Sequence, residues 1–161
     1  MDASAVDASS LVWTSARLQQ LTPLELARIY RLRQQVFLIE QNCAYLDADE
    51  ADEHAYHVAA WAPAHDLPLA YARLVDPGVK YAEPSIGRVV TSAAARGTGL
   101  GRELVRRVLA VADDVFGGQA NRISAQSHLQ RFYGGYGYEP VGTEYMEDGI
   151  PHIEMLRPRR E

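Results

Sequence analysis

A glycine-rich segment past the middle of the chain limits the possible folds more than any other feature. Residues 96–102 read Arg-Gly-Thr-Gly-Leu-Gly-Arg, shortly after a β-branched run at 86–91 and just before an amphipathic stretch. Glycines let the backbone turn tightly and approach a ligand closely. The free N–H groups and the dipole at a helix start favour an anion. The order strand, loop, helix therefore predicts a phosphate or pyrophosphate site, with Arg96 and Arg102 adding positive charge.

Other phosphate-binding loops match this segment less well. A P-loop needs Lys and then Ser or Thr after its last glycine, whereas Gly101 is followed by Arg102. The dinucleotide fingerprint needs two residues between its second and third glycines, and only Leu100 lies there. A flexible loop with no ligand is the structural alternative.

The rest of the chain predicts a single α/β domain over residues 1–161. Thr22, Pro23 and Glu25 form a helix start with a capping box, and helical spacing of apolar residues continues to Phe37. Residues 40–53 are acidic and aperiodic, which indicates a loop. A second long helix follows the glycine segment and ends at residues 117–118. The expected strands are 11–18, 56–61, 69–75, 86–91, 123–126, 138–146 and 150–156, with a short helix at 128–133.

Composition excludes several function classes. A net charge of -5 argues against a nucleic-acid partner, which needs a basic face. No apolar run is long enough for a membrane span, and the start lacks a signal peptide, so a cytoplasmic protein is expected. The single cysteine permits no disulfide within the chain. Residues 1–10 and 157–161 are expected to be mobile, and a homodimer is left open.

Two motifs in the right order and spacing resemble the GCN5-related N-acetyltransferase (GNAT) superfamily. The first is Val89-Val90-Thr91 followed by the segment 96–101 at the head of a long helix. The second is the stretch 130–138, Gln-Arg-Phe-Tyr-Gly-Gly-Tyr-Gly-Tyr, which resembles that family's tyrosine helix. The resemblance implies an α/β fold with a mixed, mostly antiparallel central sheet of six to seven strands and about four flanking helices.

A narrower resemblance, to the ElaA-type branch, covers residues 21–155. It is carried by Val-Phe-Leu-Ile-Glu-Gln-Asn-Cys at 36–43 with Tyr45, by residues 125–130, and by Glu-Asp-Gly-Ile-Pro-His-Ile at 147–153. The chain departs from the superfamily at Gln126, where an asparagine that contacts the cofactor is common. The side-chain amide of Gln126 is still able to make that contact with the cofactor.

The resemblance implies that acetyl-CoA is the cosubstrate. Its pantetheine arm would lie beside the fourth strand, and a backbone N–H near Val90 would polarise the thioester carbonyl. The implied cofactor-binding residues are Val89, Val90, Thr91, Arg96, Gly97, Thr98, Gly99, Leu100, Gly101, Arg102, Gln126 and Tyr133. For Val89 and Val90, burial in a strand is an equally good account of the residue types.

Tyr133 is the candidate general acid. Attack of an amine on a thioester expels a thiolate, and a nearby phenol can stabilise or protonate that sulfur. The structural alternative is a buried aromatic ring on a short helix.

The base and the acceptor are not determined by the sequence. A lysine-type amine must lose a proton, and Glu40, Asp148 and His152 are base or acceptor-site candidates because they lie in the branch-like segments. Arg73 and Arg88 could attract an acidic acceptor or pair with the acids of residues 40–53. An acid-rich loop near the cleft would favour a cationic amine. A small-molecule, peptide or protein amine remains possible.

Three alternatives complete the sequence-based interpretation. His54, His57 and His65 are too loosely spaced to predict a metal site, so no metal is expected. Cys43 lacks a visible His and acid partner for acyl transfer, which favours an ordinary thiol. A CoA-binding regulatory protein without turnover, or a partner-binding module without CoA affinity, would share much of the pattern with the favoured N-acetyltransferase.

Overall fold

The computed structural model describes residues 10–160, so most of the expected N-terminal arm, 1–9, and residue 161 lie outside the described part. Every helix within residues 10–160 is too short or too polar to cross a bilayer. The α-helices are α1 (Pro23–Arg33), α2 (Leu100–Phe116) and α3 (Gln130–Gly134). The strands are β1 (Val12–Arg17), β2 (Ala55–Trp61), β3 (Ala70–Val75), β4 (Ser85–Thr91), β5 (Asn121–Gln126), β6 (Glu139–Glu147) and β7 (Ile150–Arg157).

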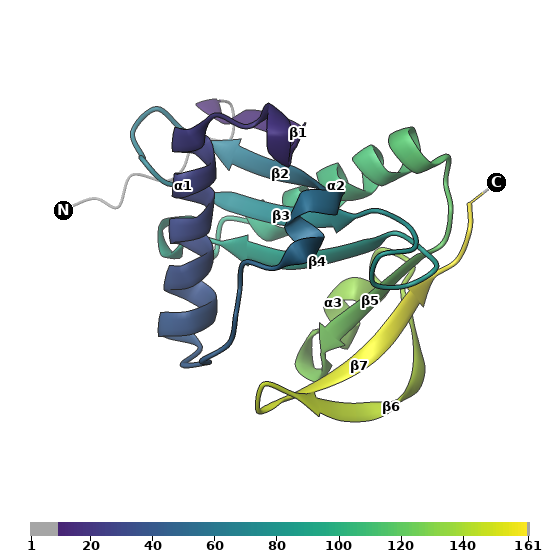
Figure 1. The fold of residues 1–161 in the computed structure, drawn as a ribbon. Helices are drawn as coiled ribbons and strands as arrows, with labels where there is room; N and C mark the ends of the chain where they lie inside the picture. The colour runs from purple at the N-terminus through teal and green to yellow at the C-terminus, as the bar shows by residue number, and fades with distance from the viewer. Residues whose placement is uncertain (1–9, 161) are drawn as a thin grey trace.

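The seven strands form two antiparallel sheets, with orders β1-β2-β3-β4 and β5-β7-β6. The strand number agrees with the expected six to seven, but the sheet is divided between β4 and β5 (Figure 1). Only their starts are joined: Arg122 N donates to Pro84 O at 3.1 Å, and Ile86 N donates to Asn121 Oδ1 at 3.4 Å. Past these contacts the two strands diverge, and the gap between them sets the place of the site.

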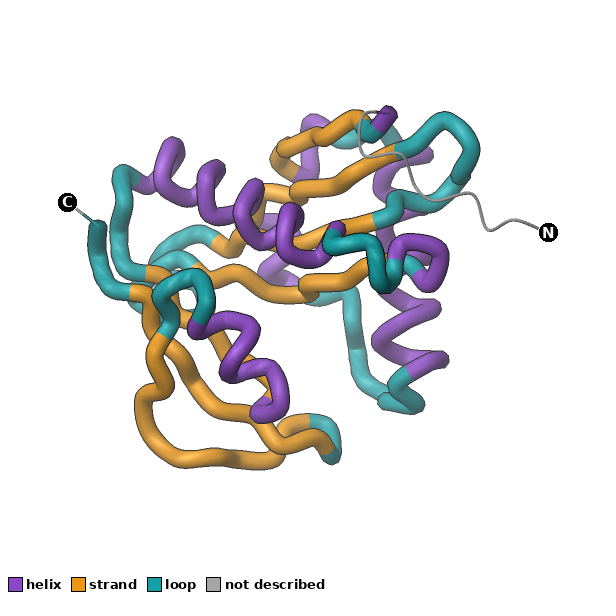
Figure 2. Tube along the Cα trace, turned by 180° about the vertical axis from the view of Figure 1, so that it is seen from behind, coloured by secondary structure: helices purple, strands orange, loops and turns teal. Residues whose placement is uncertain are grey.

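The helices cover both faces of the first sheet. α2 lies on one face and is seen in front of the strands in Figure 2, whereas α1 lies on the other face. The apolar stripe of α2 is buried as its periodicity predicts, and its buried members are Leu100, Leu104, Val105, Val108, Leu109 and Ala112. They pack with β3 side chains such as Leu74, while Ile29 and Leu32 of α1 pack with Tyr71 on the opposite face.

The first helix begins as predicted and ends differently. Thr22 Oγ1 accepts from Glu25 N, and Glu25 Oε1 accepts from Thr22 N, which completes the capping box. The α-helix stops at Arg33, and the chain continues as a π-helical segment, η3 (Gln34–Glu40), instead of ending near Phe37. The wider turns keep Phe37 buried in the cluster with Tyr71 and Val90, contacts that local periodicity does not report.

Short 3-10 turns occupy several segments expected to be loop: η2 (Leu18–Gln20), η4 (Glu50–His54) and η5 (Ala93–Ala95). The expected helix at 128–133 is a 3-10 turn, η6 (Ser127–Leu129), followed by α3. Arg157, expected in a mobile tail, is the last residue of β7 and is buried. Arg160 N donates to Gly118 O at 2.9 Å, which ties the C-terminal segment to the end of α2.

Candidate active site

A cleft of about 380 Å³ opens where β4 and β5 diverge. One wall is β4 with the end of β3, and the other is β5 with the β6–β7 turn and α3. The segment 41–49, which leads from η3 to η4, closes a third side. Cys43 Sγ lies 3.6 Å from Asp148 O, so this segment contacts the β6–β7 turn across the cleft. Among the sequence-predicted residues, Val89, Gln126, Tyr133, Asp148 and His152 line the cleft.

A β-bulge shapes the β4 wall. Tyr71 is paired with Val90 and Arg73 with Gly87, so Arg88 and Val89 together oppose Ala72. Arg88 takes a positive φ of 50°, an uncommon conformation for a residue with a side chain. On the side away from β3, no strand within residues 10–160 pairs with Val89, Val90 or Thr91. Their main-chain polar groups on that edge are therefore available to an extended ligand.

The glycine segment has the conformation that its sequence predicts. Gly97 and Gly99 have φ of 79° and 81°, and a Cβ at either position would meet nothing within 4 Å. Gly99 is the N-cap of α2 and supplies no side chain to cap it, which leaves first-turn N–H groups without that acceptor. Thr98 Oγ1 donates back to Ala95 O and braces the turn. This exposed turn at the start of a 17-residue helix fits a pyrophosphate.

Arg96 and Glu40 are paired with each other. Arg96 Nη1 donates to Glu40 Oε1 at 2.8 Å, and both side chains are exposed. The guanidinium lowers the pKa of Glu40. Glu40 therefore lies at the surface beside the glycine segment and outside the cleft lining, apart from the other two base candidates.

Tyr133 lies on α3 with its ring packed edge-to-face against Phe132 and Tyr138. Only 8% of the residue is exposed, and burial raises its pKa to about 12. No group within residues 10–160 accepts a hydrogen bond from its hydroxyl, although the residue lines the cleft. The side chain is thus a buried, protonated phenol with its donor uncommitted.

Asp148 and His152 belong to the β6–β7 hairpin. Asp148 is in the turn with a φ of 50°. His152 Nδ1 lies 2.7 Å from Ile150 O, and because a carbonyl only accepts, Nδ1 carries the proton. In the neutral ring Nε2 therefore has the lone pair, and it lies 3.4 Å from Glu147 Oε2. Tyr145 stacks on His152 and shares a hydrogen bond with the Ser124 hydroxyl.

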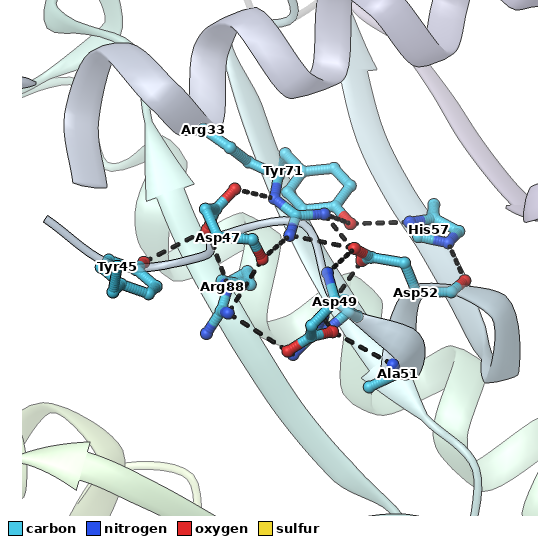
Figure 3. Close-up of polar contacts among 10 residues, drawn as sticks. Arg33, Tyr45, Asp47, Asp49, Ala51, Asp52, His57, Tyr71 and Arg88 are labelled. Carbon is cyan, nitrogen blue, oxygen red and sulfur yellow. Dashed lines mark hydrogen bonds and ion pairs between the residues drawn. The ribbon is translucent and has the colours of Figure 1, made fainter. Parts of the chain in front are cut away.

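A buried ionic cluster fixes the third side of the cleft (Figure 3). Arg33 contacts Asp47 at 2.8 Å and Asp52 at 2.7 Å. Arg73 contacts Asp49 at 2.6 Å and Asp52 at 3.0 Å. Arg88 Nε lies 2.8 Å from Asp47 Oδ1. Of the two roles left open for Arg73 and Arg88, pairing with the acidic segment is therefore the one observed.

His57 of β2 and Tyr71 of β3 extend this cluster through further hydrogen bonds. His57 Nε2 lies 2.9 Å from Asp52 O and must donate to it, so Nδ1 accepts from the Tyr71 hydroxyl at 2.7 Å. Burial lowers the pKa of His57, which agrees with a neutral ring. Sequence reasoning missed Arg33 and the three aspartates as a unit. The only signal in the sequence was the excess of acids at residues 47–53, together with arginines on the predicted first helix and on the predicted strands.

Solved structures with this arrangement include acyltransferases. The chain is similar to an acyl-CoA N-acyltransferase from Pseudomonas aeruginosa, with a TM-score of 0.87 and 43% identity over 92% of this chain and 99% of that one. It is also similar to Escherichia coli ElaA, with a TM-score of 0.84 and 35% identity over 91% of this chain and 99% of that one. The fold and the cleft thus define an acyltransferase.

The sequence profile of the acetyltransferase (GNAT) domain matches residues 34–157, and the chain belongs to this family. A curated relative, UPF0039 protein sll0451 of Synechocystis, is 40% identical over 89% of this chain and 93% of its own length. Members of the family use acyl-CoA or acetyl-CoA as cosubstrate. The resemblance to the GNAT superfamily and its ElaA-type branch is confirmed.

Proposed function

We propose that this protein is an N-acetyltransferase that transfers acetyl from acetyl-CoA directly to a primary amine. The observation that carries the proposal is the combination of the unpaired edge of β4, the glycine turn at the start of α2 and the uncommitted hydroxyl of Tyr133. Val89 of that edge and Tyr133 line the cleft, and the glycine turn lies outside its lining. A catalytically silent CoA-binding protein would need the first two features and not the third.

In the proposed complex the pantetheine arm runs along Val89, Val90 and Thr91 as an extra strand. The turn from Gly97 to Arg102 holds the pyrophosphate through main-chain N–H groups, with Thr98 and Leu100 inside the turn. A main-chain N–H near Val90 donates to the thioester carbonyl oxygen, where negative charge develops during attack. The Gln126 amide, at the end of β5, is available to the arm from the opposite wall.

Tyr133 is proposed to act on the leaving sulfur by hydrogen bonding. A thiol has an ordinary pKa near 8.5. With its pKa raised to about 12, the Tyr133 phenol is the weaker acid, so full proton transfer to the thiolate is uphill. Donation of a hydrogen bond needs no such transfer and stabilises the sulfur as the C–S bond breaks. The proton that finally resides on the CoA thiol then comes from the attacking amine, by way of solvent or the phenol.

The amine must be neutral before it attacks. Asp148 and His152 remain the proposed acceptors of its proton, directly or through a water, because both line the cleft. His152 fits better as a base, since Nε2 has the lone pair in the neutral ring and Glu147 Oε2, 3.4 Å away, can stabilise the imidazolium that proton uptake forms. Glu40, held by Arg96 at the surface, is proposed only for the rim near the cofactor loop.

The test is a turnover screen of amines with acetyl-CoA, read by release of free thiol. The panel contains polyamines, amino sugars, amino acids and short peptides, and propionyl-CoA and butyryl-CoA are compared with acetyl-CoA. Acetylation of at least one amine, confirmed by product mass, is the expected result. Binding of CoA in calorimetry without transfer to any amine would instead establish the silent CoA-binding protein. Absence of CoA binding would contradict both.

A further inference from the structure

Three aspartates of the segment 41–53 are paired with arginines, and Asp49 is the one of them that lines the cleft. Asp47 and Asp52 are almost fully buried and contact Arg33, and Asp49 contacts Arg73. With Arg88 on Asp47, three guanidinium groups balance three carboxylates. The cluster is therefore neutral as a unit, and the sequence-based expectation that these acids recruit a cationic amine loses its basis.

Lys80 is a further cation of the cleft, and it is not part of this neutral cluster. It is the only lysine in the chain and lies between β3 and β4, where it lines the cleft. No carboxylate within residues 10–160 is in ion-pair contact with it, and its side chain is accessible to a ligand. Partial burial and the nearby charges of Arg73 and Arg88 lower its pKa, and the charges of Asp49 and Glu147 oppose that shift. Lys80 is therefore a cation of the cleft that no carboxylate within residues 10–160 holds in an ion pair.

The same wall has a surplus of hydrogen-bond donors. Arg73 is 1% exposed, and its Nε is buried without an acceptor in the part of the chain that the structure describes. The acids that remain uncommitted to arginines lie opposite, in the β6–β7 turn, where Glu147 and Asp148 line the cleft. The cleft is thus bipolar, with positive charge at the β3–β4 wall and negative charge at the hairpin turn.

We infer that the acceptor is an amine that also carries a carboxylate, as a free amino acid does, and that Lys80 binds this carboxylate. The inference rests on the proposed N-acetyltransferase function and narrows its substrate class. In this arrangement the amino group lies toward the hairpin turn, near Asp148 and His152. The amine nitrogen forms the amide bond, the C–S bond breaks, and CoA leaves as the thiol with the proton that the amine gave up.

The experiment uses matched acceptors that differ only in the carboxylate. L-leucine, L-methionine and L-alanine are each compared with their methyl esters and with the amines that lack the carboxyl group. The amino acids are expected to have kcat/KM values about 10- to 100-fold higher, the range for a hydrogen bond to a charged group. Lys80→Met should erase this preference, while Lys80→Arg should keep most of it. Both variants should bind acetyl-CoA as the parent does.

Two outcomes separate this inference from the proposed function. Acetylation of the esters and simple amines as efficiently as the amino acids would overturn the carboxylate site and leave the acetyltransferase standing. If no amine is acetylated, calorimetry of N-acetyl-L-leucine and its methyl ester with the CoA-saturated protein decides the matter. Tighter binding of the free acid, lost in Lys80→Met, would support the site although turnover fails, and equal binding would overturn it. Acetylation of Lys80 itself, found by peptide mapping, would also overturn its role as an anion anchor.

Discussion

At the scale of single residues, the hydroxyl of Tyr133 is the group whose loss should separate chemistry from binding. Tyr133→Phe keeps the ring and its edge-to-face contacts and removes only the donor. The turnover rate should fall by about 10²-fold, because stabilisation of the leaving sulfur is lost, while acetyl-CoA affinity changes little. Steady-state kinetics on an amine from the screen and calorimetry of acetyl-CoA measure the two effects.

A neighbouring tyrosine provides the matched control. The Tyr138 hydroxyl donates to Asn121 Oδ1 at 2.6 Å and is buried away from the cleft lining. Tyr138→Phe should cost about 1 kcal/mol of stability and leave turnover near the parent value. A Tyr133→Phe enzyme that works within about twofold of the parent would make Tyr133 a core aromatic, and stabilisation of the leaving sulfur would then have to come from water or from another residue such as His152.

At the scale of elements, the start of α2 should bind the pyrophosphate of CoA. With CoA at about 100 times its dissociation constant, mass action adds about 2.7 kcal/mol of stability, seen as a rise of several degrees in the melting temperature. Gly99→Glu should abolish this rise, because it brings bulk and negative charge to the helix start. Gly142→Glu is the control: its φ of 84° is as positive and its surroundings as open, but it lies on β6. An unchanged CoA shift in folded Gly99→Glu protein would move the site elsewhere.

Arg33 connects two elements far apart in sequence, α1 and the segment 47–52. Arg33→Met should destabilise the protein by about 3–5 kcal/mol, since it leaves Asp47 and Asp52 buried without their main counter-charge. Arg122→Met, which removes partly exposed pairs with Glu83 and Glu154, should cost at most about 1 kcal/mol. Urea denaturation of both variants measures the difference, and equal costs would mean that the buried cluster contributes no more than surface pairs.

The elements that the sequence predicts well are those determined by local chemistry. Thr22 and Glu25 define the start of α1, and Gly117 and Gly118, both at positive φ, end α2. The π-helical segment after Arg33 depends on packing of Phe37 against Tyr71 and Val90, residues far along the chain, so periodicity does not reveal it. The division into two sheets depends likewise on how β4 packs beside β5, two strands that are far apart in the sequence.

The candidate site shows the same limit. The cofactor loop is a contiguous run, and its turn and positive φ values follow from its glycines. The acceptor side is assembled from segments near residues 45, 80 and 150, so its charge balance appears only when each acid is matched with its arginine. Arg73 and Arg88 illustrate this, because either of their two sequence-based roles satisfies the local pattern.

At the scale of the whole molecule, burial of His57 should make stability depend on pH. An unfolded histidine titrates near pH 6.5, and burial lowers the pKa of His57 in the folded protein. Below pH 6.5 the unfolded chain therefore binds more protons at this site than the folded one. Its contribution to stability is complete above the unfolded pKa and is lost as pH falls toward the folded pKa. The free energy of unfolding should decrease from pH 7.5 to pH 5.

His57→Gln isolates this contribution. The substitution should lower stability at pH 7.5 by about 1–3 kcal/mol, because the hydrogen bonds to the Tyr71 hydroxyl and to Asp52 O are disturbed. It should also flatten the fall between pH 7.5 and pH 5, since no imidazole remains to be protonated on unfolding. His65→Gln, at an exposed position, should leave the slope unchanged. Urea denaturation at four pH values with equal m-values measures both slopes. A slope in His57→Gln as steep as in the parent would show that the pH dependence arises from groups other than His57.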